Sequence, residues 1–564
     1  MKKIVLLLFL FLIVTQNVFA FDFSRPNNKF GIHLAQPHLS DLKKTEELVN
    51  SNGGNWGYIT LVIQEDDRNH QKWQEIFDLL REYHLIPIIR IATYPDGANW
   101  KRPAKEEAQS WADFLDSIRW VVKNRYVVLF NEPNHGSEWG GTVDAYNYAE
   151  VSKEFAEKLK AKNTDFFVML AALDSSAPTS MPYYLGEEYF FQNFFQAVSV
   201  TDFERLFDGL ASHSYPNPGF SGSPWDSGRG TIRSYDWERS LLKSIKVQKE
   251  FPVFITETGW STDRLSRETI ASYFQAAYQN IWLPDEHVVA VTPFVFDYQG
   301  EPFLNFSWKQ FQSEEFYPQY YTVQSLPKTG GDPEQIDTGE LFVDLPKELV
   351  VNSNYHFRVK LKNRGQAIWE KNDGYQLSVI GNKEKKAIEY FFSDLKKIKP
   401  FEEANIDLYI KTDIVGKDTA KIVLMKKDRE ILETSDWQYE VVPLPSLQFK
   451  TKLFPKLIPE GEHFEIQIFD DKEELVFKKG GIHMSSGTSH LDEIQNVIPG
   501  RQYRTVLLNR YYLPRQAFMS FKRGENFVTF KRMYPLDLDE NGHFDWGDLG
   551  ALFKSPELMR LFFP

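Results

Sequence analysis

Short apolar runs alternate with longer amphipathic stretches from Phe30 to Tyr298. Eight of these runs are rich in β-branched and aromatic residues, a pattern typical of buried parallel strands. We predict strands over residues 31–35, 56–63, 86–92, 126–131, 166–172, 209–213, 253–257 and 288–296. The stretches between them are amphipathic and predict helices over residues 41–51, 70–83, 105–122, 143–162, 187–198, 233–250 and 265–281.

Eight strands regularly interleaved with helices, over about 250 residues, indicate an α/β fold of the (β/α)₈ or TIM barrel type. The alternative is a doubly wound open sheet, which normally carries a glycine-rich phosphate turn after its first strand. Here the first strand reads Gly31-Ile-His-Leu-Ala-Gln36 and has no such turn. The barrel is therefore the favoured fold.

The period of the pattern changes to two beyond a Gly/Pro cluster at residues 327–333, which follows an aromatic extension of the barrel. Alternating runs after this cluster predict an antiparallel β-sandwich, and a further set predicts a second β-module. We expect a barrel domain with its extension over residues 21–330, an immunoglobulin-like sandwich over 338–443 and the second β-module over 444–532.

The chain begins with two lysines, an apolar run from Ile4 to Val14 and the tripeptide Val18-Phe-Ala20, which suits a signal peptidase. We predict that residues 1–20 are a removed secretory signal. The alternative is an uncleaved membrane anchor, for which the apolar core is short. No later stretch is long and apolar enough to cross a bilayer. We therefore expect a secreted, extracellular protein with no transmembrane segment after signal cleavage.

Composition narrows the expected chemistry. The absence of cysteine excludes disulfides, thiol nucleophiles and cysteine-ligated metals, so stability outside the cell has to come from a large core. The formal charge of −13 argues against nucleic acid as a partner. Aromatic residues make up 15% of the chain, which suits stacking against sugars but also suits large cores, and so does not decide between them.

Two of the predicted strands end in a glutamate. Asn131-Glu132-Pro133 ends the fourth strand, and Glu257-Thr-Gly-Trp260 ends the seventh. Because all strands of a barrel open on one face at their C-terminal ends, the two glutamates can face each other across its mouth. Two carboxyl groups about 5–5.5 Å apart suit glycosidic cleavage with retention, whereas inversion requires a wider gap that holds a water.

These two strand ends, with their spacing and strand count, resemble the retaining glycosidases of glycoside hydrolase clan A over roughly residues 29–300. The resemblance implies that Glu132 is the general acid/base, that Glu257 is the nucleophile and that Asn131 hydrogen-bonds the sugar 2-hydroxyl. No metal or organic cofactor is expected for catalysis. The alternative for either glutamate is a solvated residue at a strand end. Glu138 competes with Glu132 for its role and is expected instead to be solvated or to contact substrate.

Four further residues are candidates for substrate contact or for orienting Glu257. Clan members often carry a histidine and a tyrosine at the end of the sixth strand, where this chain has His213 and Tyr215. Tyr215 would keep Glu257 ionised through a hydrogen bond; packing at the barrel top is the alternative. Arg90 is a charge in an apolar strand and would pair with a carboxylate, either to favour ionised Glu257 or as a structural ion pair. His33, on the first strand, is the remaining candidate.

The end of the eighth strand departs from the family pattern. Clan members commonly place a tryptophan there as the floor of the cleaved subsite, whereas this chain has Phe294-Val-Phe296-Asp-Tyr298. We expect Tyr298 or Phe296 to replace that ring, or Trp260 and Trp139 to supply stacking from neighbouring loops.

Residues 537–548 fit an EF-hand-type calcium loop with Gly542 at the sharp turn. The expected ligands are Asp537, Asp539, Asn541, the backbone carbonyl of His543, Asp545 and Asp548. One such loop resembles half of a dockerin, which carries two, so attachment to a cohesin is not expected. We predict a structural Ca²⁺ that orders residues 533–564; an acidic surface turn is the alternative.

These patterns together predict a secreted retaining glycoside hydrolase that cleaves O-glycosidic, β-linked bonds of a polysaccharide or oligosaccharide. One alternative is a surface carbohydrate-binding protein with an inactive barrel, against which the intact Asn131, Glu132 and Glu257 argue. Another is a transglycosylase that uses the same covalent intermediate. The first β-module resembles immunoglobulin-like modules around Asn363 and Trp369, and would either bind glycans or space the barrel from a cell surface. The sequence predicts no oligomeric state.

Overall fold

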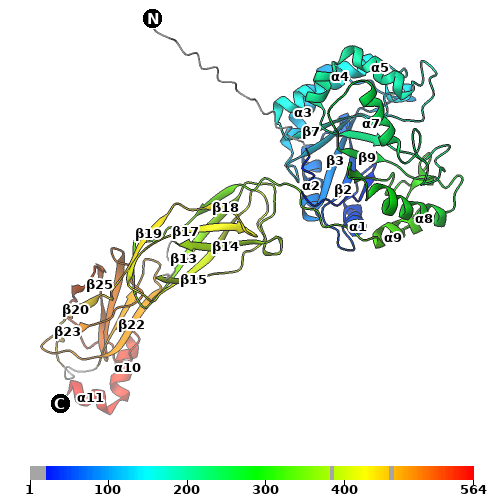
Figure 1. Cartoon of the computed structure of the whole chain (residues 1–564). Helices are drawn as coiled ribbons and strands as arrows, with labels where there is room; N and C mark the ends of the chain where they lie inside the picture. Colours follow the sequence, from blue (N-terminus) through cyan, green and yellow to red (C-terminus); the bar gives the residue numbers. More distant parts are fainter. Residues whose placement is uncertain (1–20, 382–386, 457–462, 564) are drawn as a thin grey trace, which may run out of the picture. The chain divides into compact units, whose positions relative to one another are not determined.

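A computed structural model describes residues 21–381, 387–456 and 463–563 (Figure 1). The predicted signal segment, residues 1–20, lies outside the described residues. The chain divides into two compact units between Ile336 and Asp337. Each unit contains a hydrophobic core of its own.

Eight strands of the first unit form a parallel barrel: β1 (Gly31–Leu34), β2 (Gly57–Gln64), β3 (Leu85–Ala92), β6 (Arg125–Leu129), β7 (Phe166–Leu170), β8 (Leu210–His213), β9 (Val253–Glu257) and β10 (Val288–Val291). Strands β1 to β7 pair in the order β1-β2-β3-β6-β7, and the other three in the order β8-β9-β10. Parallel bridges between Met169 and Gly209 and between Phe30 and Val291 join the two sheets at both edges. The predicted (β/α)₈ fold is therefore confirmed.

The seam of the barrel depends on a glycine in β1. A Cβ atom at Gly31 would lie 2.6 Å from Cγ2 of Thr292 and 2.8 Å from the carbonyl oxygen of Tyr58. Glycine therefore allows β1 to pass closely between β2 and the end of β10. The hydroxyl groups of Thr60 and Thr292 share a hydrogen bond of 2.8 Å beside this seam.

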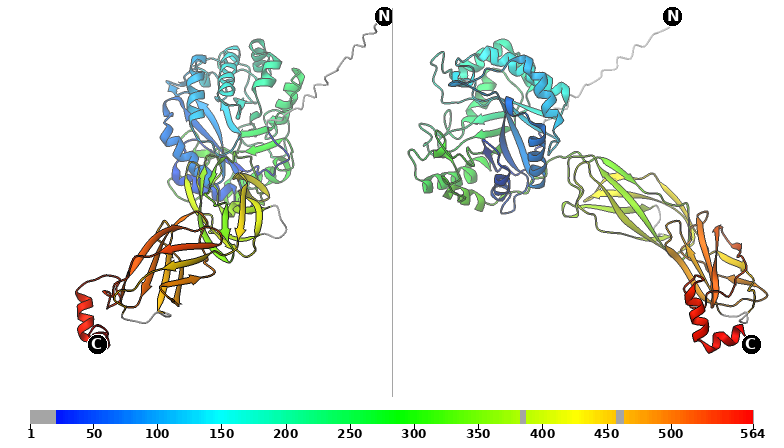
Figure 2. Two further views of the ribbon diagram at one scale, coloured as in Figure 1. Left: turned by 90° about the vertical axis from the view of Figure 1, so that its left-hand side faces the viewer. Right: turned by 180° about the vertical axis from the view of Figure 1, so that it is seen from behind.

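Helices surround the strands of the first unit (Figures 1 and 2). They are α1 (Leu39–Val49), α2 (His70–Glu82), α3 (Ala108–Ser117), α4 (Ala145–Lys162), α5 (Glu187–Ala197), α6 (Val200–Leu206), α7 (Ser234–Ser244), α8 (Arg267–Ala277) and α9 (Pro318–Ser325). The side chains of Asn69, Asp144 and Ser266 accept hydrogen bonds from backbone N–H groups in the first turns of α2, α4 and α8. These caps satisfy donors that have no partner within the helix.

Short helical turns and one hairpin complete the first unit: the 3₁₀ turns η1 (Glu65–Asp67), η2 (Lys105–Glu107), η3 (Gly136–Glu138) and η5 (Leu304–Phe306), the π-helical turn η4 (Tyr278–Trp282), and the strands β4 (Pro95–Asp96) and β5 (Asn99–Trp100). The predicted helix over residues 265–281 therefore includes α8 and most of η4.

Three predicted elements extend about five residues past the observed ends, and α6 was not predicted. Helix α3 ends at Ser117, where the Trp120 indole donates to the Leu115 carbonyl and the chain becomes extended. Helix α7 ends at Ser244, two residues before Lys246, whose φ of 73° is incompatible with a right-handed helix. Strand β10 ends at Val291 because Pro293 has no N–H to continue the ladder.

The second unit consists mainly of strands. They are β11 (Gly339–Phe342), β12 (Glu348–Val350), β13 (Ser353–Asn363), β14 (Tyr375–Gly381), β15 (Ile388–Phe392), β16 (Glu403–Thr412), β17 (Gly416–Lys426), β18 (Arg429–Glu433), β19 (Trp437–Val442), β20 (Ser446–Lys450), β21 (Phe464–Phe469), β22 (Leu475–Ile482), β23 (Thr488–Leu491), β24 (Gln502–Asn509), β25 (Tyr512–Ser520) and β26 (Glu525–Thr529). The turn η6 (Lys371–Asp373) and helices α10 (Trp546–Lys554) and α11 (Pro556–Phe562) complete it.

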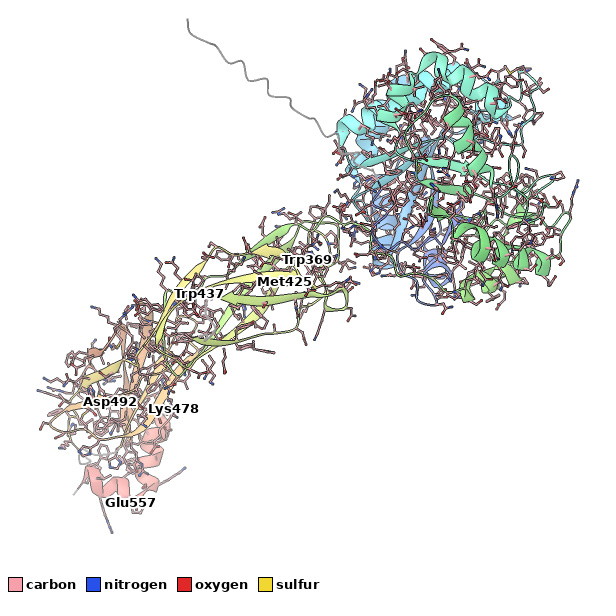
Figure 3. The ribbon with its side chains drawn as sticks, in the orientation of Figure 1. Trp369, Met425, Trp437, Lys478, Asp492 and Glu557 are labelled. Carbon is pink, nitrogen blue, oxygen red and sulfur yellow. The ribbon has the colours of Figure 1, made fainter. Side chains whose placement is uncertain are left out.

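Four sheets surround the core of this unit, in the orders β11-β13-β16-β15, β12-β19-β17-β14, β23-β20-β26 and β22-β21-β24-β25. Two pairs, β12–β19 and β20–β26, are parallel and depart from the predicted antiparallel pattern. One hydrophobic cluster runs through all four sheets, from Leu349 to Met533. Trp369 and Trp437, labelled in Figure 3, are buried members of this cluster.

The part of the chain that the structure describes contains no helix with both the length and the apolar character needed to cross a membrane.

Candidate active site

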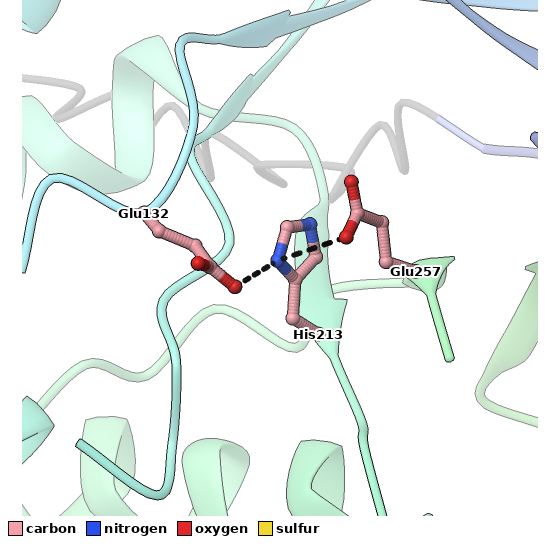
Figure 4. A group of neighbouring side chains, drawn as sticks. All are labelled: Glu132, His213 and Glu257. Carbon is pink, nitrogen blue, oxygen red and sulfur yellow. Dashed lines mark hydrogen bonds and ion pairs between the residues drawn. The ribbon is translucent and has the colours of Figure 1, made fainter. Parts of the chain in front are cut away.

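The two glutamates predicted from the strand ends meet at the mouth of the barrel. Glu257 is the last residue of β9, and Glu132 follows β6. A carboxylate oxygen of Glu132, one of Glu257 and a ring nitrogen of His213 all lie within 4.8 Å of one another (Figure 4). Glu132 has a φ of 31°, which is uncommon for a residue with a side chain, and its N–H donates to the carbonyl of Ala172 at 3.2 Å.

His213 lies between the two carboxylates. Its Nδ1 is 2.7 Å from Oε1 of Glu132 and 3.8 Å from Oε2 of Glu257. Burial alone would lower the pKa of His213, but the charge of Glu257 and the hydrogen bond to Glu132 outweigh burial and raise it. Of the two roles predicted for His213, substrate contact is disfavoured, because the ring is buried and does not line the cavity at the site. Its position suits holding the two glutamates instead.

Glu257 has charged and neutral partners on two sides. Nη1 of Arg90 donates to its Oε1, and the Tyr215 hydroxyl donates to its Oε2 at 2.9 Å. Burial would raise the pKa of Glu257, but the charges of His213 and Arg90 outweigh burial and hold it at about 2. Glu257 is therefore ionised at neutral pH, which is the state that a nucleophile requires.

His33 is buried behind Glu257. Its Nδ1 lies 3.5 Å from Oε1 of Glu257, and neither ring nitrogen has a hydrogen-bond partner among the described residues. Burial and the neighbouring Arg90 charge lower the pKa of His33 to about 3, so the ring is neutral at neutral pH. The predicted substrate contact of His33 is wrong, because its side chain is fully buried. The positive charge that faces Glu257 therefore comes from Arg90 and His213.

Asn131 links the two halves of the site. Its Oδ1 accepts a hydrogen bond of 2.7 Å from Nη1 of Arg90, and its side chain also hydrogen-bonds Glu138. Burial and the charge of Glu132 raise the pKa of Glu138 to about 7. Glu138 lines the same cavity as Glu132, so it is positioned to contact a bound molecule.

A cavity of about 320 Å³ lies over the glutamates. Arg90, Asn131, Glu132, Tyr215 and Glu257 line it, as do the aromatic residues Trp100, Phe130, Phe220, Phe294, Phe303 and Phe306. A pocket with apolar walls and a few converging polar groups is typical of a site for a small or chain-like ligand. The predicted residues Asn131, Arg90 and Tyr215 are therefore brought to this cavity.

The aromatic residues expected to stack against a sugar are not the ones that line the cavity. Trp139 and Trp260 are buried, and their indole N–H groups donate to Asn147 and to the carbonyl of Gly222. Phe296 is also fully buried, and Tyr298 packs edge-on against Phe303 outside the cavity lining. The structure therefore does not bring Trp139, Trp260 or Phe296 to the cavity, whereas Tyr298 lies beside it, and its stacking role stays a prediction. Phe294 provides the ring at the end of the eighth strand.

The sequence reasoning missed His135 and Asp174. Both line the cavity, and Nε2 of His135 lies 2.9 Å from Oδ2 of Asp174. Nδ1 of His135 is 3.9 Å from Oε2 of Glu132. A signal was present, because Asp174 follows the fifth barrel strand in the same way that the two glutamates follow or end theirs.

A second acidic cluster lies near the C-terminus. Carboxylate oxygens of Asp537, Asp539 and Asp548 lie within 4.8 Å of one another, and Gly542 has a φ of 89° in the turn between them. Burial, followed by the charges of Asp548 and Asp539, raises the pKa of Asp537. The cluster therefore carries negative charges at close range, as a Ca²⁺ site requires.

The other expected ligands have different contacts. Asp545 caps α10 by accepting from the N–H of Gly547, and the amide of Asn541 donates to Asp539 and Asp545. The N–H of His543 donates to the side chain of Asn541. Three of the six expected residues thus form the cluster, and the other three lie in the same turn.

No protein-family profile matches this chain, and no curated protein matches it in sequence. Among solved structures, a family 39 glycoside hydrolase from the gut symbiont Bacteroides cellulosilyticus WH2 is 16% identical with a TM-score of 0.38, over 70% of this chain and 82% of that chain. An endo-β-1,4-glucanase from Xanthomonas axonopodis pv. citri is 12% identical with a TM-score of 0.37, over 52% and 98%. A β-mannanase from Thermomonospora fusca is 12% identical with a TM-score of 0.36, over 53% and 91%. These similar structures are glycoside hydrolases, but at such identities and scores they define neither the family nor the activity of this chain.

Proposed function

We propose that this protein is a retaining glycoside hydrolase that cleaves β-linked sugars by double displacement. The observation that carries the proposal is the separation of less than 4.8 Å between a carboxylate oxygen of Glu132 and one of Glu257. Retaining enzymes place their two carboxyl groups about 5–5.5 Å apart, whereas inverting enzymes need about 6.5–9.5 Å to hold a water between them. The separation here is closer to the first range than to the second, which supports direct attack by one of the two glutamates.

In the first step, an oxygen of Glu257 attacks the anomeric carbon while Glu132 gives its proton to the departing oxygen. The carbon–oxygen bond to the leaving sugar breaks, and a glycosyl ester of Glu257 forms. Arg90 and Tyr215 bind the Glu257 carboxylate and keep it ionised until attack. Asn131, whose amide is oriented by Arg90, is placed to hydrogen-bond the sugar hydroxyl next to the reacting carbon.

In the second step, ionised Glu132 takes a proton from a water that attacks the same carbon. The ester bond to Glu257 breaks, and both glutamates return to their starting states. Two inversions at one carbon leave its configuration unchanged. The aromatic wall formed by residues such as Phe294 and Phe306 suits the apolar faces of sugar rings.

The proposal is tested by screening the purified full chain against β-glucans, β-mannans, xylans and galactans, together with its Glu257→Ala variant. We expect the wild-type chain to cleave at least one of them and the variant to lose that activity. Proton NMR of the earliest product then shows whether the anomeric configuration is retained. Equal activity of the two proteins would contradict the role of Glu257, and an inverted first product would contradict the mechanism.

We also propose that Asp537, Asp539 and Asp548 bind a structural Ca²⁺. Support comes from the three close carboxylates and the left-handed turn at Gly542. Isothermal titration of the metal-stripped full chain with CaCl₂, with MgCl₂ as the comparison, tests this. Absence of a Ca²⁺-specific heat would contradict the proposal.

Secretion is a further proposal, supported by the charged start, apolar run and cleavage-like end of residues 1–20. N-terminal sequencing of the protein exported from a bacterial host is expected to begin at Phe21. An intact first residue on a membrane-bound product would identify an anchor instead.

A further inference from the structure

We propose that His135, held by Asp174, is a positioning residue for Glu132: the pair fixes the acid/base glutamate in place and stabilises its carboxylate as the proton leaves. The inference rests on the proposed function, because it assigns a role within that reaction.

The loop that carries Glu132 is fastened to the loop after β7. The buried side chain of Asn134 donates to the carbonyl of Asp174 at 2.9 Å and accepts from the N–H of Asp174 at 3.2 Å. The bond between His135 and Asp174 adds a side-chain link between the same two loops. Glu132 lies in the middle of the fastened loop and has a left-handed backbone conformation, which is unfavourable for a side-chain-bearing residue unless its surroundings hold it.

Asp174 is itself fixed. Its Oδ1 accepts the N–H of Ser176 at 2.8 Å, so its Oδ2 is directed to Nε2 of His135. This arrangement makes Nε2 a donor and leaves Nδ1 on the side of Glu132, 3.9 Å from Oε2. Oε1 of Glu132 is already engaged by His213 at 2.7 Å. His135 therefore faces the oxygen of Glu132 that His213 does not bind.

The charges around His135 favour its protonated form. Burial alone would lower the pKa of His135, but the bond to Asp174 and the charges of Glu132, Asp174 and Glu138 outweigh burial and raise it. Burial would likewise raise the pKa of Asp174, but its hydrogen bonds to His135 and Ser176 lower it. The surroundings of the pair therefore favour the protonated form of His135 and the ionised form of Asp174.

A cation near Glu132 affects the rate of bond cleavage when the leaving group takes a proton from Glu132. When Glu132 releases its proton to the departing oxygen, a negative charge appears 3.9 Å from His135. An imidazolium at this distance stabilises that charge in the transition state. When the leaving group departs without needing a proton, this stabilisation has no effect on the rate. The contribution of His135 should therefore depend on the leaving group.

The test compares two aryl β-glycosides of the sugar that the wild-type chain cleaves, one with a 2,4-dinitrophenyl and one with a phenyl leaving group. For His135→Gln, we expect kcat/KM to fall about 10- to 100-fold for the phenyl glycoside, a part of the ~10²–10⁴-fold that general acid catalysis contributes. For the dinitrophenyl glycoside we expect a change of no more than about twofold, since that leaving group needs no proton. Asp174→Asn should change the two substrates in the same unequal way, by a smaller factor.

Two control variants distinguish an effect on proton donation by Glu132 from a loss of activity that is the same for both substrates. His287 forms a similar pair with Asp285 at 3.1 Å on an exposed part of the same unit, and His287→Gln should change neither substrate. Tyr215→Phe removes a partner of Glu257 and should lower kcat/KM for both substrates alike. The ratio between the two substrates does not depend on how much of a variant is folded, so a partly unfolded variant still gives an answer.

The pH profile provides a second readout. Activity on the phenyl glycoside requires protonated Glu132, and a carboxyl group without a nearby cation keeps its proton to higher pH. The titratable and charged groups around Glu132 are His135, His213, Tyr215, Glu138, Glu257, Arg90 and Asp174. With the other groups unchanged, His135→Gln should move the alkaline limb of kcat/KM to higher pH.

Equal losses on the two substrates, or no loss on either, would overturn the inference and leave the proposed function standing. Inactivity of the wild-type chain on every aryl glycoside and polysaccharide would overturn the proposed function and this inference with it.

Discussion

Two clusters of close carboxylates among the described residues, Glu132 with Glu257 and Asp537 with Asp539 and Asp548, are neutralised in different ways. In the barrel unit, Glu257 is faced by His213 and by the guanidinium of Arg90, which together lower its pKa. In the second unit, Asp548 is bound by the backbone N–H groups of Leu538 and Asp545, and Asp537 by that of Gly542. Backbone donors orient a carboxylate without supplying a full positive charge.

This difference agrees with the two proposals, covalent chemistry at the barrel site and ion binding at the C-terminal cluster. Where the protein supplies cations in fixed positions, the carboxylate is ionised and oriented before any ligand arrives, and its lone pair can attack carbon. Where only neutral donors are present, the negative charges of Asp537, Asp539 and Asp548 are left for a divalent cation.

The largest expected effect is the loss of the proposed nucleophile, Glu257. Glu257→Gln keeps the shape of the side chain and can still accept from Tyr215, but it cannot form the glycosyl ester. We expect kcat to fall by a factor on the order of 10⁴ to 10⁶, as for other enzymes that lose a nucleophile. Initial rates on the polysaccharide that the wild-type chain cleaves measure this. Asp548→Asn, in the other cluster, is the matched control and should leave kcat unchanged.

The next largest effect is expected when Glu257 loses a positively charged partner, which the carboxylates of the C-terminal cluster do not have among the described residues. Arg90→Met removes the guanidinium that pairs with Glu257 and keeps much of the apolar length of the side chain. A buried carboxylate without that cation has a higher pKa, and Asn131 loses its donor. We expect kcat to fall about 10²- to 10³-fold, by analogy with the loss of one donor to a charged reacting group.

The pH dependence of the same variant has a definite sign. The pKa of Glu257 is about 2 in the wild-type chain, and the nucleophile works only when ionised. The wild-type chain is therefore expected to be active above the pKa of Glu257 and to lose activity as the pH falls through that pKa. Arg90→Met raises this pKa, so the acid limb of kcat should move to higher pH. An acid limb that stays in place would show that Arg90 does not set the charge of Glu257.

The barrel could be predicted from the sequence because its strands are short apolar runs with regular spacing. Seven of the eight predicted strands agree with observed strands to within one or two residues at each end, for example 253–257 with β9. The eighth extended too far, since the apolar run 288–296 continues past the point where Pro293 ends the ladder. Apolar content alone does not distinguish a paired strand from a buried loop at the barrel mouth.

The two glutamates could be located from the sequence because each follows or ends a strand. The sequence could not show which of the neighbouring residues reach the cavity. Trp139 and Trp260 are large aromatic residues near the catalytic motifs, and nothing in the sequence shows that their rings face the core. His135 lies only three residues from Glu132, yet its role depends on Asp174, which is brought beside it by the adjacent strand. Such pairings depend on tertiary structure, which sequence spacing does not report.

The smallest expected effect concerns the C-terminal cluster and leaves activity alone. On the proposal of a bound Ca²⁺, a chelator would leave Asp537, Asp539 and Asp548 facing one another at close range, and like charges repel. A ligand present at 100 times its Kd stabilises the folded state by about 2.7 kcal/mol, so chelation should lower the Tm of the transition that belongs to the second unit by a few degrees. Differential scanning calorimetry of the full chain with and without chelator measures the shift.

In Asp548→Asn the shift should vanish, while the rate of polysaccharide cleavage should be the same with and without chelator in both proteins. If chelator leaves the Tm of the wild-type chain unchanged, backbone N–H groups alone are sufficient to hold the three carboxylates together. The two clusters would then differ only in how strongly the protein itself stabilises their negative charges.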